Sequence, residues 1–251
     1  MEIRKCILKN NDCYLAGDRI SPRGIVVHLT GANNPSLKRY VQPDDGVLGV
    51  NPNKNDWNRS DVGKCVHAFI GKDKNGKVRT YQTLPWTFRS WGCGSGSIGS
   101  YNNSRIQFEI CEDSLVDKKY FEEAFNEAIE LCVYLCEKYD LKADSITSHA
   151  ESHKKGYASN HGDCDHWLKK FGKDMNWFRR EVASRLGDKP QPHLVRINTL
   201  NLNVRNGAGT KYRINNVVKR GEVYTIVEEK DGWGRLKSGA GWINLSYTVD
   251  V

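Results

Sequence analysis

Residues 23–29 read Arg-Gly-Ile-Val-Val-His-Leu, a short apolar run with a histidine at its end. A continuous run of this length is typical of a buried strand, here one that ends in a polar group. In residues 66–70 and 78–82, apolar and polar residues alternate in the manner of strands, and Asn75-Gly76 between them predicts a hairpin turn. Residues 105–110, Arg-Ile-Gln-Phe-Glu-Ile, alternate again, so this part of the chain predicts several strands.

Further along the chain the apolar spacing changes to three and four residues. Residues 117–139 predict an amphipathic helix on this spacing, and residues 175–186 predict a second one. The apolar positions are Phe121, Phe125, Ala128, Cys132, Leu135, Phe178, Val182 and Leu186. Strands and helices together predict a mixed α/β domain over residues 1–187.

A different composition follows this domain. Gly187 is a helix-stopping residue and Pro190 and Pro192 come soon after it, so residues 188–193 are predicted to be a linker. Residues 194–251 contain short strand patterns separated by Gly, Asn and Asp turns, at 202–205, 223–227, 234–236 and 241–245. This pattern predicts a small all-β barrel.

Composition limits the classes of partner. The 251 residues carry a formal net charge of +8, which favours an acidic partner. The positive charges are scattered rather than gathered in a dense basic run, so no nucleic-acid partner is expected. No apolar run approaches the roughly 18 residues of a membrane span, so no membrane span is expected.

The first residues, Met1 to Lys9, are charged and show no secretory signal. We therefore expect synthesis in a reducing cytoplasm, where persistent disulfides among the eight cysteines are rare. Bridging of a pair after release from the cell is the alternative. Cys132 and Cys136 lie on the apolar face of the first predicted helix and are expected in the core.

Histidines gather in one window of the first domain. Four of the seven histidines of the chain, at 149, 153, 161 and 166, fall within residues 148–167, together with nearby carboxylates and a thiol. A catalytic zinc site needs three protein ligands and one open position, and His28 at its strand end is the natural distant partner. Solvated or structural histidines are the alternative interpretation of the same pattern.

Four segments in order resemble the zinc-dependent N-acetylmuramoyl-L-alanine amidase family, which includes phage amidases, autolysins and peptidoglycan recognition proteins. They are residues 25–28, 66–70, 105–110 and 148–167. The resemblance implies an α/β fold with a mixed central sheet flanked by helices. It also implies one Zn²⁺ per chain, bacterial peptidoglycan as substrate, and cleavage between N-acetylmuramic acid and L-alanine.

The resemblance assigns roles to individual residues. His28, His149 and Asp163 match the metal ligands. Cys164 stands where relatives have proline, and because some relatives use cysteine as third ligand it is a rival to Asp163. Glu109 matches the general base, and His161 occupies a position from which a side chain would stabilise the oxyanion.

Two segments depart from the family pattern. Gln107 and Phe108 precede Glu109 where relatives have glycine and an aliphatic residue. The family's Trp-His-Ala-Gly segment is represented by residues 90–94, Ser-Trp-Gly-Cys-Gly, without a histidine. The substrate contacts of that segment are therefore not carried over to this chain.

Residues 200–210, Leu-Asn-Leu-Asn-Val-Arg-Asn-Gly-Ala-Gly-Thr, resemble the opening of bacterial SH3-like domains, and later elements follow in order. Such domains bind cell wall, which implies wall targeting by residues 194–251. Trp233 and Trp242 are either core or ligand contacts, and Tyr212 is the expected exposed contact.

Two rivals share these motifs: a peptidoglycan receptor that binds without cutting, and a hydrolase that cuts an amide within the stem peptide. The setting we expect is a phage endolysin released to the wall of a Gram-positive host through a holin-type pore, with a bacterial autolysin as the alternative. Oligomeric state is not predicted.

Overall fold

The computed structural model describes residues 1–187 and 192–251. These form two compact units, Met1–Val182 and Ala183–Val251. Residues 188–191 of the predicted linker 188–193 lie outside the described residues, and His193 begins a strand. Among the described residues, no helix combines the length and apolarity that crossing a membrane requires.

The first unit is built on a mixed six-stranded sheet with the order β1-β4-β3-β5-β2-β6. Only β3 and β4 pair antiparallel, and the other neighbours are parallel. The strands are β1 Ile3–Lys5, β2 Ile25–Leu29, β3 Ala68–Lys72, β4 Val78–Gln82, β5 Ile106–Ile110 and β6 Ile146–Ser148. All five residues of β2 and of β5 are buried, as the apolar run at 23–29 predicts for a central strand.

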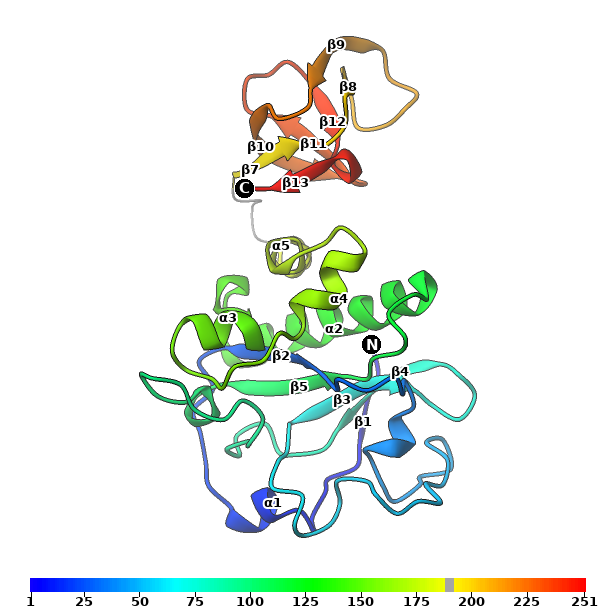
Figure 1. The fold of residues 1–251 in the computed structure, drawn as a ribbon, viewed down its shortest axis with the longest axis vertical. Helices are drawn as coiled ribbons and strands as arrows, with labels where there is room; N and C mark the ends of the chain where they lie inside the picture. The colour runs from blue at the N-terminus through cyan, green and yellow to red at the C-terminus, as the bar shows by residue number, and fades with distance from the viewer. Residues whose placement is uncertain (188–191) are drawn as a thin grey trace. The chain divides into compact units, whose positions relative to one another are not determined.

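Helices flank this sheet, which confirms the predicted fold class. The α-helices are α1 Asp12–Ala16, α2 Lys118–Tyr139, α3 His149–Lys154, α4 Asp165–Lys170 and α5 Met175–Arg185. Short 3₁₀ turns occur at η1 Leu37–Arg39, η2 Tyr101–Asn103 and η3 Ala143–Ser145. Figure 1 shows α2, α3 and α4 on one face of the sheet, with α1 beyond the other.

The long helix α2 packs its apolar stripe on the sheet. Its N-cap Asp117 accepts the Tyr120 N–H, which satisfies one of the free donors of the first turn. Trp167 of α4 is fully buried, with its ring centroid 5.4 Å from that of Phe125. Cys132 and Cys136 are buried free thiols, as predicted.

Two expectations need correction. The predicted strand 66–70 begins two residues later, at Ala68, and its ladder with β4 continues to the pair Lys72–Val78 beside the tight turn at Asn75-Gly76. Cys13 and Cys65 form a disulfide, so the favoured expectation of free thiols is wrong for this pair and the alternative of a bridged pair holds. No sequence pattern pairs these two residues, whose contact arises only when α1 folds against the loop before β3.

The second unit is a seven-stranded antiparallel sheet with the order β13-β7-β10-β11-β12-β8-β9. The strands are β7 His193–Ile197, β8 Asn201–Arg205, β9 Ile214–Lys219, β10 Val223–Lys230, β11 Trp233–Leu236, β12 Trp242–Asn244 and β13 Thr248–Asp250, with a 3₁₀ turn η4 at Leu245–Tyr247. It has its own apolar core around Val204, Ile226 and Ile243. Trp233 is buried, Trp242 is half-buried, and Tyr212 is exposed.

Candidate active site

Three side chains from distant parts of the sequence converge near the C-terminal end of β2. His28 comes from β2, His149 is the first residue of α3, and Asp163 lies in the loop before α4. The Nδ1 atoms of the two histidines are 3.0 Å apart, and Asp163 Oδ2 lies 3.3 Å from Nδ1 of His28 and 3.7 Å from Nδ1 of His149. The structure thus brings together all three residues that the sequence assigns to the metal.

Local structure explains how these side chains are positioned. β6 pairs with β2, and the chain turns directly from Ser148 at its end into α3. Ser148 and Glu151 form a capping box, so the first turn of α3, which carries His149, has a fixed orientation. Asp163 is held by its own carbonyl, which accepts the Ala150 N–H at 2.9 Å, and by its carboxylate, which accepts the Leu29 N–H at 3.3 Å.

The hydrogen bonds on the far side of each ring determine where the protons lie. Nε2 of His149 is 3.0 Å from the Ser159 carbonyl oxygen, which can only accept, so Nε2 carries the hydrogen. Nε2 of His28 faces Oε1 of Gln107 at 2.9 Å in the same way. The Nδ1 atoms of both rings therefore face one another and the Asp163 carboxylate, an arrangement that is favourable only when a proton or a metal cation lies between the three atoms.

Two imidazoles and one carboxylate are the donor set of a catalytic zinc site, in which three protein ligands leave one position for water. The far-side hydrogen bonds are also what such ligands require, since a ligating histidine donates its other N–H to an acceptor. The residues present therefore fit a zinc ion.

Burial, hydrogen bonds and neighbouring charges shift the pKa values of the three clustered residues. Burial opposes charge on His28, but the hydrogen bond to Asp163 outweighs it and raises the pKa of His28. Burial and the neighbouring charge of His28 lower the pKa of His149 to about 4. Burial disfavours the Asp163 carboxylate, yet the hydrogen bond and the charge of His28 lower its pKa to about 2.

Glu109 lies directly beside this cluster. It stands opposite His28 in the parallel pairing of β2 and β5, so both side chains leave the sheet on the same face. Burial raises the pKa of Glu109 to about 7, where a carboxyl group can both accept and donate a proton near neutral pH. Its Oε2 atom is buried and has no hydrogen-bond partner among the residues that the structure describes.

The remaining predicted residues occupy different positions. His161 is exposed, and its ring centroid is 4.7 Å from that of His149, so it borders the cluster. Cys164, the rival ligand, is buried with its Sγ atom 3.6 Å from Sδ of Met175, and it is not one of the three clustered ligands.

Three other histidines contact groups outside the cluster. His67 is fully buried between the Phe88 carbonyl and the Gln107 N–H, and burial lowers its pKa to about 4. Nδ1 of His153 bonds the Ala158 carbonyl, and Nε2 of His166 lies 3.1 Å from Oε2 of Glu112. For these three, the structural interpretation of the sequence holds.

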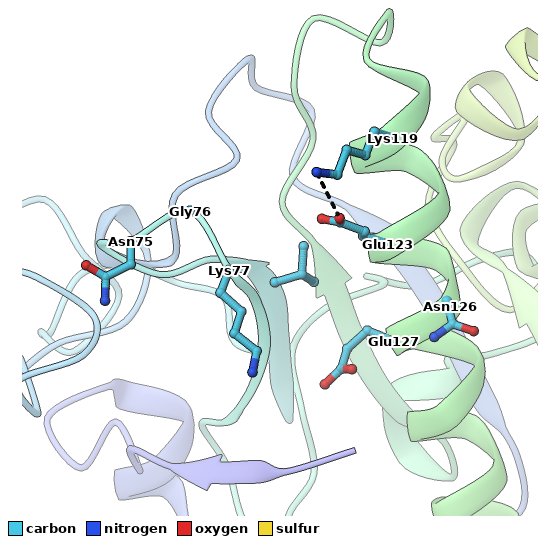
Figure 2. A pocket seen from close by; sticks show the side chains of 8 residues that line it. Asn75, Gly76, Lys77, Lys119, Glu123, Asn126 and Glu127 are labelled. Carbon is cyan, nitrogen blue, oxygen red and sulfur yellow. Dashed lines mark ion pairs between the residues drawn. The ribbon is translucent and has the colours of Figure 1, made fainter.

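A hollow lies elsewhere on the first unit, between the β3–β4 turn and α2 (Figure 2). Lys77, Lys119, Glu123 and Glu127 line it, and Lys119 and Glu123 form an ion pair at 3.8 Å. None of the clustered ligands lines this hollow.

Gln107 is the site residue that sequence reasoning missed, since it was noted only as a departure from the family pattern. A signal existed: Gln107 and Glu109 are two apart on one strand, so they project from the same face of the sheet.

Comparison with known proteins identifies the two parts. Residues 18–165 match the profile of the N-acetylmuramoyl-L-alanine amidase family, and residues 200–248 match that of the bacterial SH3 domain. No curated protein matches the chain by sequence.

Several solved structures share the fold. The hydrolase AmiA of Staphylococcus aureus, in complex with its ligand, is 19% identical with a TM-score of 0.51, over 76% of this chain and 88% of that one. A point mutant of PlyL is 21% identical with a TM-score of 0.50, over 73% and 99%. The PlyG catalytic domain is also 21% identical with a TM-score of 0.50, over 76% and 99%.

At these identities the structural likeness shows the fold alone, whereas the family profile covers more than half of the chain. The chain therefore belongs to the N-acetylmuramoyl-L-alanine amidase family, is a peptidoglycan amidase, and carries a bacterial SH3 domain in its second unit.

Proposed function

We propose that this amidase hydrolyses the bond between the lactyl group of N-acetylmuramic acid and L-alanine with one zinc ion held by His28, His149 and Asp163. The observation that carries the proposal is the convergence of three acceptor atoms beside a buried carboxyl group, that of Glu109. A zinc ion there would polarise the amide carbonyl and lower the pKa of a water molecule toward about 7.

The protein's own groups then move the protons. Glu109 accepts a proton from the attacking water and delivers it to the leaving amine, a role that suits a buried carboxyl group whose pKa burial raises. His161, at the exposed border of the cluster, donates a hydrogen bond to the oxyanion that develops on the carbonyl oxygen.

The metal assignment is tested by elemental analysis. Purified protein is expected to contain about one zinc per chain, in line with a three-ligand catalytic site. His28→Ala, His149→Ala and Asp163→Ala should each lose zinc and lysis, while Cys164→Ser should keep both. Retention of zinc by Asp163→Ala together with its loss from Cys164→Ser would make Cys164 the third ligand.

The reaction itself is tested on purified walls. Mass spectrometry of digested peptidoglycan should show new amino groups on L-alanine with the glycan intact. New termini inside the stem peptide would identify a different amide bond, and no release of any product would identify a receptor.

We further propose that residues 1–187 are the catalytic domain, residues 188–193 a linker, and residues 194–251 a wall-targeting domain of an endolysin. The pairing of an amidase with a bacterial SH3 domain supports action on whole walls. Synthesis in the host cytoplasm and release through a holin-type pore would then give access to the substrate. Expressed alone, the protein should leave host cells intact, and co-expression with a pore-forming holin should lyse them. Lysis of cells without the holin would favour an autolysin with its own export route.

A further inference from the structure

Gln107 is a fully buried amide on β5, and it contacts the ring of His28. We infer that Gln107 is a positioning residue, which fixes the His28 ring so that its Nδ1 lone pair faces the metal cluster. The inference rests on the proposed zinc site for its functional meaning, but the positioning itself is a property of the metal-free protein.

The orientation of the Gln107 amide is determined by its other neighbour. Oδ1 of Asn102 accepts the backbone N–H groups of Gly92 at 3.2 Å and Cys93 at 3.1 Å. Because those groups can only donate, this atom of Asn102 must be its oxygen. Nε2 of Gln107 donates to the same oxygen at 2.8 Å. The other end of the amide, Oε1, is thereby directed at Nε2 of His28, 2.9 Å away.

The consequence is a relay of fixed hydrogen bonds from the backbone to the candidate ligand. Oε1 can only accept, so Nε2 of His28 carries the hydrogen, and in the neutral ring Nδ1 keeps its lone pair. Ser159 does the same for His149 with a backbone carbonyl. His28 instead depends on a side chain, and its orientation can therefore be changed by a single substitution.

Gly92 provides the room for this side chain. A Cβ atom at position 92 would lie 2.5 Å from Oε1 of Gln107 and 3.0 Å from Cγ1 of Val66. Both Gly92 and Gln107 depart from the family pattern, and here the two departures meet in space. The large residue on the strand occupies volume that a side chain at position 92 would otherwise fill.

The first test uses Gln107→Met, which keeps the volume and removes the acceptor. In metal-free protein at a pH above the pKa of His28, long-range ¹H–¹⁵N NMR of the histidine rings should show the Nε2–H form of His28 in the wild type and loss of that fixed tautomer in the variant. Zinc affinity, measured by competition with a chromophoric chelator, should fall about 10- to 100-fold, the usual effect of removing a partner of a ligating histidine.

Gln82→Met is the matched control. Gln82 is buried in β4 of the same sheet, and its amide donates to the Leu84 carbonyl at 3.0 Å. This variant should lose stability but keep the zinc affinity and the His28 tautomer of the wild type. A fall in zinc affinity equal to that of Gln107→Met would mean that the effect is general destabilisation.

A second variant, Gly92→Ala, leaves Gln107 in place but displaces its carbonyl, so it should change the tautomer and zinc affinity in the same direction. The inference would be overturned if Gln107→Met kept the zinc affinity and the His28 tautomer of the wild type. If Gln107→Met does not fold, the same result in Gly92→Ala would overturn it. Failure of the wild type to bind zinc would overturn the proposed function instead, and the tautomer measurement would still decide the inference.

Discussion

Glu109 is the residue whose chemistry is most sharply defined by its surroundings. Burial raises its pKa to about 7, and one of its carboxylate oxygens has no hydrogen-bond partner within the described part of the chain. This oxygen therefore remains available for a hydrogen bond with a substrate or a water molecule. These properties distinguish it from Glu112, which already bonds His166.

Glu109→Gln keeps the shape of the side chain and removes the proton acceptor. We expect it to retain zinc and wall binding while the rate of amide hydrolysis falls about 10²- to 10⁴-fold, the usual contribution of a general base. Glu112→Gln, the same change three residues further along, should keep most of the activity. Product release should be followed on purified walls with zinc content measured in parallel, and near-normal hydrolysis by Glu109→Gln would contradict the assigned role.

For individual residues, the sequence predicts the type of site better than it predicts every residue that forms the site. His28, His149 and Asp163 converge as expected, because a family motif carries each of them. Gln107 had no such motif, and its contact with His28 depends on the empty space at Gly92, which no spacing rule describes.

At the scale of elements, α3 couples helix capping to ligand geometry. The Ser148 hydroxyl accepts the Glu151 N–H at 3.0 Å, and His149 lies between these two residues. Glu151 is in turn held by Arg179 of α5 through two hydrogen bonds of 2.8 and 3.0 Å. Any loosening of this first turn therefore moves a candidate ligand.

Ser148→Ala should destabilise the first unit by about 1 kcal/mol, the usual cost of losing an N-cap. Because His149 follows directly, zinc affinity should fall as well, by up to about five-fold if the whole cost is transferred to binding. Asp117→Ala removes the N-cap of α2 and should cost similar stability with no change in zinc affinity. Thermal unfolding and chelator competition measure the two effects, and equal zinc affinities in both variants would argue against the coupling.

Asp45 joins a loop to the edge of the sheet. Its carboxylate accepts from the N–H groups of Val47 and Leu48, from the Tyr81 hydroxyl at 2.9 Å and from Arg4 of β1 at 3.0 Å. Burial acts against the charged form, but the Val47 and Tyr81 hydrogen bonds prevail and lower the pKa of Asp45 to about 2.

A carboxylate whose folded pKa lies below its ordinary value of 3.8 stabilises the fold above that value. Its contribution is lost as pH falls toward about 2, where the folded protein also takes up the proton. Asp45→Asn should therefore melt below the wild type at pH 7, and the gap should begin to close below about pH 4. Melting temperatures across this range check the sign, and a gap of constant size would show that another group carries the effect.

The elements that sequence patterns predicted are the long helix, the apolar strand and the alternating strands. The 22-residue helix α2 and the strands β2, β4 and β5 repeat their pattern often enough to be recognised. By contrast, α3 and α4 have six residues each and β6 has three, too few for a period to emerge. These short elements carry or adjoin the candidate ligands. The site was therefore predicted from the family motifs and not from the periodicity of apolar residues.

At the scale of the whole molecule, each of the two units has hydrophobic packing of its own. One includes Leu37, Phe69 and Tyr81 under the mixed sheet, and the other includes Val204, Ile226 and Ile243 within the antiparallel sheet. A domain with its own core can in principle fold alone. The three clustered metal ligands and Glu109 all lie in the first unit, so the second is expected to contribute binding only.

Attachment to an insoluble substrate raises the local concentration of cleavable bonds, with gains of about 10²-fold or more. Residues 1–187 alone should therefore retain zinc and cut soluble muropeptides at the normal rate, but lyse whole cells poorly. Residues 194–251 fused to a fluorescent protein should label host walls without lysing them, and Tyr212→Ala, at the exposed ring beside Gly207 and Gly209, should weaken that labelling. If the fusion fails to bind purified walls while residues 1–187 lyse cells at the full rate, the second domain has no targeting role.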